Sequence, residues 1–206
     1  TRTAVHLAAR LQGEIISADS RQVFRGMDLG TGKELQEYQL GEQLIRHHLI
    51  DIANPGEEYS VYRFQQDFIQ AYNEIRGRNH FPILCGGTGL YLESVEKGYR
   101  MIGVPADEDL RARLNNKSMD ELIAMLATYR KPHSTTDTCD RQRILRAIEI
   151  ERYHRENPDA GHQLPVMKHL VAGIRIEREE IRKRITRRLE QRMNTGMVEE
   201  VRGLLD

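Results

Sequence analysis

The chain alternates short apolar segments with amphipathic segments of helical period, and this alternation restricts the folds open to it. Residues 2–11 carry apolar side chains at near-helical spacing and lead into the apolar pair Ile15-Ile16. A second amphipathic stretch covers 61–76, and a short apolar strand at 82–85 follows it. Strands that alternate with helices in this way predict an α/β protein with a parallel, doubly wound sheet.

Local signals mark where these elements begin and end. Ser60 is a candidate N-cap for the helix after it, and Gly77 is a candidate C-cap. A further apolar run at 49–52 stops at the turn-forming residues 54–56. Asp51 in this run follows a predicted strand, where a metal-linked carboxylate could lie, and its role stays unassigned.

The character of the chain changes near Pro105. Residues 107–162 are strongly charged and helical in pattern, without a convincing strand. Ser118 and Glu121 have the spacing of a capping box, and a second helix is expected over 140–156. We interpret 107–162 as a helical insertion.

The chain then returns to the first kind of pattern. Residues 170–176 have strand character, and a long final helix is expected to end near Gly196. One side of that helix is marked by Ile181, Ile185, Leu189 and Met193. The predicted α/β core therefore comprises 1–106 and 163–206.

Composition excludes some classes of protein. Lys plus Arg and Asp plus Glu both number 31, so the net charge is zero, which argues against a uniformly basic nucleic-acid binder but not against a local basic patch. No apolar run is long enough to cross a membrane, and the start of the chain lacks a signal-peptide pattern, so we expect a cytoplasmic protein. Cys85 and Cys139 have no metal-binding spacing and are expected to be reduced thiols.

Polar side chains gather where the first apolar strand ends. Asp19 follows this strand directly, Ser20, Arg21 and Gln22 come next, and glycines recur through 26–32. The carboxyl ends of strands carry the sites of α/β proteins. A loop rich in donors and glycines suits a phosphorylated ligand or a nucleobase, although an ordinary turn is the structural alternative.

Two other segments are candidate binding sites. Gly86-Gly87-Thr88-Gly89 lies between a strand and a helix, where backbone N–H groups and the Thr88 hydroxyl can hold an anion, unless Thr88 is only an N-cap. The other segment is the predicted helical stretch 140–149, in which Ile144 and Leu145 are expected to pack inward. The polar residues that can share its outer face are Gln142, Arg143 and Arg146. This face and the basic run at 182–192 could contact a polyanion, or they could be solvated helix surfaces.

Taken together, five segments resemble the successive motifs of bacterial tRNA dimethylallyltransferases, also called tRNA isopentenyl transferases. They occur in the family's order with compatible spacing, and they are 17–22, 26–31, 48–51, 86–91 and 142–149. The resemblance implies a P-loop NTPase-like, nucleotide-binding fold. It also implies transfer of a dimethylallyl group from dimethylallyl diphosphate to the exocyclic amino group of the adenosine adjacent to the anticodon.

The resemblance assigns site residues as well. It implies that Asp19 is the general base and that Thr1 contacts the diphosphate and Mg²⁺. The positions that would contact tRNA are Asp19, Ser20, Arg21, Gln22, Thr88, Arg111, Gln142, Arg143, Ile144, Leu145 and Arg146. The implied partners are a tRNA anticodon stem-loop and dimethylallyl diphosphate, and we expect a monomer.

The family's phosphate loop, Gly-x-x-x-x-Gly-Lys-[Ser/Thr], would end at Thr1, and a basic motif of the family would follow 203–206. We therefore expect the 206-residue sequence to be a fragment that binds dimethylallyl diphosphate weakly and is inactive. The alternatives are an isopentenyltransferase acting on free adenine nucleotides, a P-loop small-molecule kinase and a non-catalytic RNA-binding remnant. An insertion that carries Gln142, Arg143 and Arg146 favours a large RNA acceptor.

Overall fold

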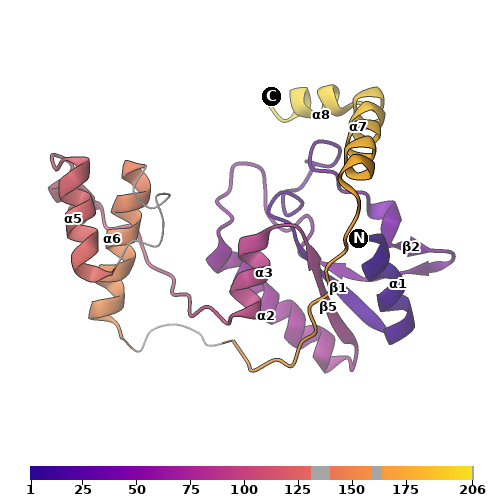
Figure 1. Ribbon diagram of the computed structural model, residues 1–206, viewed down its shortest axis with the longest axis horizontal. Coiled ribbons are helices and arrows are strands. Elements are labelled where there is room, and N and C mark those ends of the chain that lie inside the picture. Colours follow the sequence, from indigo (N-terminus) through magenta and orange to yellow (C-terminus); the bar gives the residue numbers. More distant parts are fainter. Residues whose placement is uncertain (131–139, 159–163, 206) are drawn as a thin grey trace. The chain divides into compact units, whose positions relative to one another are not determined.

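The computed structural model describes residues 1–130, 140–158 and 164–205. They belong to two compact units (Figure 1). The first comprises Thr1–Tyr99 and Leu164–Asp206, and the second is Arg100–Gln163.

A three-stranded parallel sheet forms the centre of the first unit. β1 (Gly13–Ala18) lies between β4 (His47–His48) and β5 (Phe81–Gly86). β1 pairs with β5 over its whole length, and Ala18 at its end lies opposite Gly86. The segments that follow β1 and β5 therefore leave the sheet side by side. The predicted parallel α/β sheet is confirmed.

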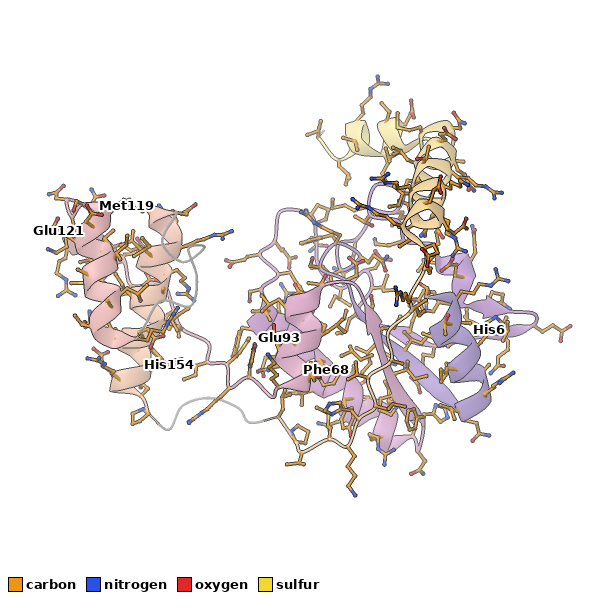
Figure 2. The ribbon with its side chains drawn as sticks, viewed as in Figure 1. His6, Phe68, Glu93, Met119, Glu121 and His154 are labelled. Carbon is orange, nitrogen blue, oxygen red and sulfur yellow. The ribbon has the colours of Figure 1, made fainter. Side chains whose placement is uncertain are left out.

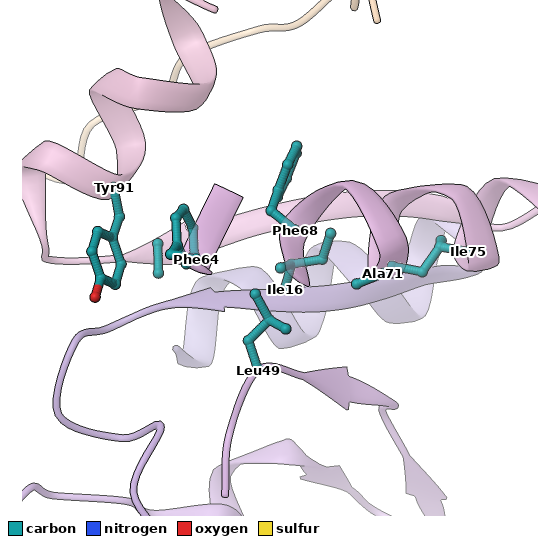
Figure 3. Close-up of a cluster of buried hydrophobic side chains, with 8 residues drawn as sticks. Ile16, Leu49, Phe64, Phe68, Ala71, Ile75 and Tyr91 are labelled. Carbon is teal, nitrogen blue, oxygen red and sulfur yellow. The ribbon is translucent and has the colours of Figure 1, made fainter. Parts of the chain in front are cut away.

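Helices cover both faces of this sheet. α1 (Arg2–Leu11) packs on the face that carries Ile15. α2 (Val61–Gly77) and α3 (Gly89–Glu96) pack on the opposite face, where Figure 3 shows Ile16 beneath the side chains of α2. Neighbouring residues of a strand point to opposite faces, so the apolar pair Ile15-Ile16 supplies both cores.

The ends of α2 follow the predicted signals in part. The Ser60 hydroxyl accepts the N–H of Arg63 at 3.3 Å, which confirms Ser60 as the N-cap. Gly77 is the last residue of the helix, and Arg78 is the C-cap, so the predicted C-cap is wrong by one residue.

Smaller elements connect β1 to α2. A 3₁₀ helix, η1 (Leu35–Tyr38), precedes the antiparallel pair formed by β2 (Gln39–Leu40) and β3 (Gln43–Leu44). The strand β4 ends at His48, before the apolar run at 49–52. Leu49 and Asp51 have positive φ angles of 62° and 56°, which a strand does not allow, so this run is a buried bend.

The second unit contains three helices in its described residues. They are α4 (Glu108–Leu114), α5 (Met119–Tyr129) and α6 (Arg141–Glu156). Leucine and isoleucine side chains from all three form one buried cluster. Figure 2 labels Met119 and Glu121 in the first turn of α5, where Ser118 and Glu121 form the predicted capping box. The expected absence of strands holds for the described residues of 107–158.

The C-terminal part of the first unit differs from the prediction. The strand expected at 170–176 is wrong: residues 164–177 contain neither helix nor strand, and Leu170 is 93% exposed. A strand needs a neighbour to satisfy its backbone groups, and no strand in the described part of the chain pairs with this segment. The predicted long helix is confirmed as α7 (Arg178–Asn194), but it is not the final helix, because α8 (Met197–Gly203) follows it after Gly196.

The described residues also test the predictions about membrane-spanning helices and cysteines. No helix in the described part of the chain is long and apolar enough to cross a membrane. Cys85 is half-buried and is not in a disulfide. Cys139 lies outside the described residues.

Candidate functional site

The loops after β1 and β5 are joined by direct hydrogen bonds. The backbone N–H of Thr88 donates to the carbonyl of Ala18 at 3.1 Å, and the backbone N–H of Ser20 donates to Thr88 Oγ1 at 3.0 Å. Thr88 occupies the N-cap position of α3, but its side chain does not cap that helix. The Thr88 hydroxyl instead donates to Ser20 Oγ at 3.3 Å. The structure thus brings Ser20 and Thr88 together.

Glycine at position 86 makes this approach possible. A Cβ atom at Gly86 would lie 2.2 Å from the carbonyl oxygen of Ala18 and 2.4 Å from its carbonyl carbon. Both are backbone atoms of the paired strand, so they cannot move aside without separating β1 from β5. The next residue, Gly87, has open space where its Cβ would be.

Asp19 holds the start of its own loop. Its Oδ1 accepts the backbone N–H groups of Arg21 at 2.9 Å and Gln22 at 3.2 Å. Its second oxygen, Oδ2, has no hydrogen-bond partner among the described residues, and the side chain is half-buried. One oxygen therefore orients the carboxylate while the other can accept a proton, which is the arrangement that a general base requires.

The rest of this loop is built around Lys33. Its side chain is fully buried, and Nζ donates to Asp28 Oδ1 at 2.9 Å, to Asp51 and to the carbonyl of Phe24. Asp51, which the sequence left unassigned, is therefore the ion-pair partner of a lysine. Gln22 Nε2 donates to the carbonyl of Gly32 at 3.2 Å, so its amide is fixed by the same loop.

The glycine-rich part of the loop contacts the C-terminal helices. Glu200 of α8 accepts the backbone N–H groups of Asp28 at 3.0 Å, Leu29 at 2.6 Å and Gly30 at 2.9 Å. The sequence predicted that these donors bind a ligand, but a carboxylate of the same chain takes them. Sequence reasoning missed Glu200 because it lies 170 residues or more from its partners and has no local signal of its own.

In the second unit, two predicted RNA-contacting residues hold a buried acid. The side chain of Glu149 is 1% exposed, and its carboxylate accepts hydrogen bonds from Arg111 Nε at 2.5 Å, Arg146 Nη1 at 2.9 Å and the backbone N–H of Asp107 at 3.3 Å. Burial raises the pKa of Glu149, but these hydrogen bonds outweigh it and hold the pKa below its ordinary value. Arg111 and Arg146 therefore stabilise this unit.

The remaining predicted residues of α6 divide by burial. Ile144 and Leu145 lie in the buried cluster of the second unit, so their side chains present no surface to an RNA. Gln142 and Arg143 are exposed, and Asp140 Oδ1 accepts their backbone N–H groups at 2.7 and 3.2 Å. The side chain of Arg143 has no polar partner among the described residues, which leaves its guanidinium available to bind an anion.

The predicted diphosphate and metal site has one residue in this chain, Thr1. Thr1 is exposed at the N-cap of α1, and its carbonyl accepts the N–H of Val5 at 3.0 Å. The described residues contain no group of three or more His, Cys, Asp or Glu side chains that could hold a metal ion. The Thr1 hydroxyl could supply one oxygen ligand, and Mg²⁺ commonly takes its other ligands from water and substrate phosphates; no chemical step is assigned to the ion.

Comparison with known proteins identifies the family to which this chain belongs. Residues 22–206 match the family model described as IPP transferase. A protein named tRNA dimethylallyltransferase 2 from Bacteroides fragilis is 53% identical over 205 residues, which cover 100% of this chain and 67% of the relative. Among solved structures, the full-length tRNA isopentenylpyrophosphate transferase from Bacillus halodurans is similar, with 35% identity and a TM-score of 0.61.

That likeness covers 100% of this chain and 65% of the solved one, so the chain spans about two thirds of the length of these relatives. A eukaryotic dimethylallyltransferase acting on tRNA has 21% identity and a TM-score of 0.67, over 98% of this chain and 52% of that one. At this identity the likeness concerns the fold alone. The predicted fold class and the resemblance to the family are confirmed.

Proposed function

Because the chain belongs to the IPP transferase family, together with proteins named tRNA dimethylallyltransferases, we propose that it takes part in prenyl transfer to tRNA. The donor is dimethylallyl diphosphate, and the acceptor is the exocyclic amino group of the adenosine adjacent to the anticodon. The observation that carries the proposal is the geometry of Asp19: one carboxylate oxygen holds the loop, and the other has no partner among the described residues.

The chemistry explains why a carboxylate is needed at this position. An N–C bond forms between the adenine amino group and the allylic carbon, the C–O bond to the diphosphate breaks, and one proton leaves the amino group. The amino lone pair is delocalised into the ring, so a base that accepts the proton helps in the transition state. In this proposal Asp19 Oδ2 takes the proton while the electron pair of the breaking bond leaves with the diphosphate.

The acceptor base has to leave its stack to reach a carboxylate. Anticodon loops are single-stranded, so this extrusion costs little in an anticodon stem-loop. Ser20, Arg21 and Gln22 follow Asp19 directly, and Thr88 is hydrogen-bonded to Ser20, so we place these side chains against the same nucleotide.

In the second unit, only some of the side chains that the sequence predicts to contact RNA would be free to bind it. Gln142 and Arg143 are exposed on the first turn of α6 and are the members of the predicted set whose side chains can meet phosphates. Arg111 and Arg146 share Glu149, so their charges are partly neutralised within the protein. In this proposal, Gln142 and Arg143 make the RNA contacts that the resemblance assigns to Ile144 and Leu145.

The other expected properties belong to the same proposal. Thr1 and Mg²⁺ would lie at the diphosphate, and the protein would act as a monomer in the cytoplasm. The relatives are named for tRNA, which disfavours a transferase of free adenine nucleotides and a small-molecule kinase.

Replacement of Asp19 by asparagine tests the proposal. The asparagine side chain would retain an oxygen for the N–H groups of Arg21 and Gln22 but could not accept the proton. In the full-length protein we expect turnover with tRNA and dimethylallyl diphosphate to fall roughly a hundredfold or more, while the Kd for tRNA stays within about tenfold. Asp19→Ala, which also removes the loop contacts, should impair both turnover and tRNA binding.

Unchanged turnover in Asp19→Asn would remove Asp19 from the mechanism. The function itself is tested by mass spectrometry of tRNA from cells that lack the gene. Loss of the prenyl group from the adenosine next to the anticodon supports the proposal, and a tRNA population with the prenyl group intact contradicts it.

A further inference from the structure

The glycine-rich segment 26–32 forms a docking surface for the C-terminal helices. Its glycines at 30 and 32 face side chains of α8 and α7, and Gly26 faces Leu204, the residue that follows α8. A Cβ at Gly30 would lie 3.4 Å from Glu200 Oε1, and a Cβ at Gly26 would lie 4.0 Å from Leu204. At Gly32 the same atom would lie 2.2 Å from Arg192 Nη2. A Cβ at Gly26 or Gly30 would make ordinary van der Waals contact, whereas a Cβ at Gly32 would displace the Arg192 guanidinium, so the segment lies directly against the C-terminal residues.

Glu200 makes the most specific contact of this docking surface. Three successive backbone N–H groups converge on its carboxylate, two on Oε2 and one on Oε1. Such concave arrays of N–H groups bind anions, and a charged acceptor makes each bond stronger than a neutral one. Arg188 and Arg192 of α7 add ion pairs with Glu34 at 2.6 and 3.2 Å.

The docking surface is linked to the candidate site by a short series of hydrogen bonds. Lys33 N–H donates to the carbonyl of Asp28 at 2.9 Å, which closes the loop that Glu200 holds. The carbonyl of Gly32 in this loop accepts Gln22 Nε2 at 3.2 Å. The position of the Gln22 amide thus depends on a loop whose other side is held by α8.

We propose that Glu200 is a positioning residue for tRNA recognition: through the loop at 28–33 it fixes Gln22 beside Asp19. The inference rests on the proposed function, because Gln22 is placed against the acceptor nucleotide there. It assigns to the C-terminal helices a role in the first unit's site that they fulfil without touching the substrate.

The variant Glu200→Gln tests the contact with little change in size. An amide has one acceptor oxygen, and its NH₂ group would face an N–H donor, so at least one of the three bonds is lost. The matched control is Glu199→Gln, because Glu199 is exposed and pairs only with Arg202, at 3.8 Å, among the described residues. Hydrogen exchange of the Asp28, Leu29 and Gly30 amides should accelerate about tenfold or more in Glu200→Gln and stay unchanged in the control.

Steady-state kinetics then separate positioning from a purely structural role. In the full-length protein we expect KM for tRNA to rise about three- to tenfold in Glu200→Gln, with kcat and KM for dimethylallyl diphosphate within about twofold. Accelerated exchange with an unchanged KM for tRNA would show that Glu200 only holds the loop, and unchanged exchange would remove the contact itself; either result overturns the inference. If the unsubstituted full-length protein does not prenylate tRNA, the proposed function fails, and the exchange measurement still reports whether Glu200 holds the loop.

Discussion

The backbone N–H of Ser20 donates to the hydroxyl of Thr88 at 3.0 Å, a hydrogen bond between residues 68 positions apart that joins the loops after β1 and β5. The variant Thr88→Val keeps the shape of the side chain but leaves the Ser20 N–H without its acceptor. We expect a loss of about 1 kcal/mol in unfolding free energy and a several-fold weaker Kd for tRNA. Thr88→Ser retains the hydroxyl and should behave like the unsubstituted protein; equal binding by the serine and valine variants would show that the hydrogen bond has no role.

Arg143 is expected to contribute one phosphate contact. Its side chain is exposed and has no polar partner among the described residues. Arg143→Ala should weaken tRNA binding and reduce the slope of log K against log salt concentration by about one. Arg113→Ala, at an exposed position of α4 in the same unit, is the control and should leave the slope unchanged. The measurement is a filter-binding titration at several salt concentrations, and equal slopes for the two variants would contradict the assignment.

Glu149 should be required for the stability of the second unit. Glu149→Gln weakens the bonds to Arg111 and Arg146, although both guanidinium groups keep some contact with water. We expect a loss of about 1–3 kcal/mol in unfolding free energy, measured by urea denaturation. Glu108→Gln removes the other carboxylate near Arg111, which lies 3.4 Å from the guanidinium. Because Glu108 is exposed, this variant should lose less than about 0.5 kcal/mol in unfolding free energy. A larger effect at Glu108 than at Glu149 would disprove this account.

Glu14, at the opposite end of β1 from Asp19, should make stability depend on pH. Burial raises its pKa, but hydrogen bonds from Arg78, His48 and His80 outweigh burial and lower the pKa from 4.5 to about 2. The unfolded chain therefore takes up the proton first as the pH falls. The stabilisation is complete above pH 4.5 and should decline by up to about 1.4 kcal/mol per pH unit between pH 4.5 and about 2.

Urea denaturation at several pH values tests this dependence. Glu14→Gln should be less stable at pH 6 and should lose stability less steeply in the acid range. Glu42→Gln, at an exposed position, should retain the full dependence. If Glu14→Gln and the unsubstituted protein decline in parallel, another group is responsible.

Gly86 should not tolerate a side chain. In Gly86→Ala the methyl group would lie 2.2 Å from the Ala18 carbonyl oxygen, and strands β1 and β5 would have to separate. We expect a loss of about 1–3 kcal/mol in unfolding free energy, measured as a lower Tm. Gly87→Ala is the matched control, since a Cβ there has open space and should change Tm little. Equal Tm values for the two variants would mean that the strands adjust without cost.

The sequence was informative wherever the interaction that forms an element is local. Ser60 and Ser118 cap helices through residues three positions away, and both were predicted. The apolar pair Ile15-Ile16 indicated a strand, and the structure buries it on both faces, because alternate side chains of a strand point to opposite sides. The motif at 17–22 likewise placed Asp19 at the end of that strand, where the structure has it.

Only the tertiary structure decided which distant partner each polar or apolar group has. The run at 170–176 is as apolar as a strand, yet no strand in the described part of the chain pairs with it. Segment 26–32 looked like a ligand loop, yet Glu200 takes its N–H groups. A local pattern records propensities and contacts within a few residues, whereas a strand or a buried charge is stable only with a partner from elsewhere in the chain. The sequence therefore predicted most of the longer helices and the position of Asp19, and the fold determined which of the surrounding donors and charges remain available to a substrate.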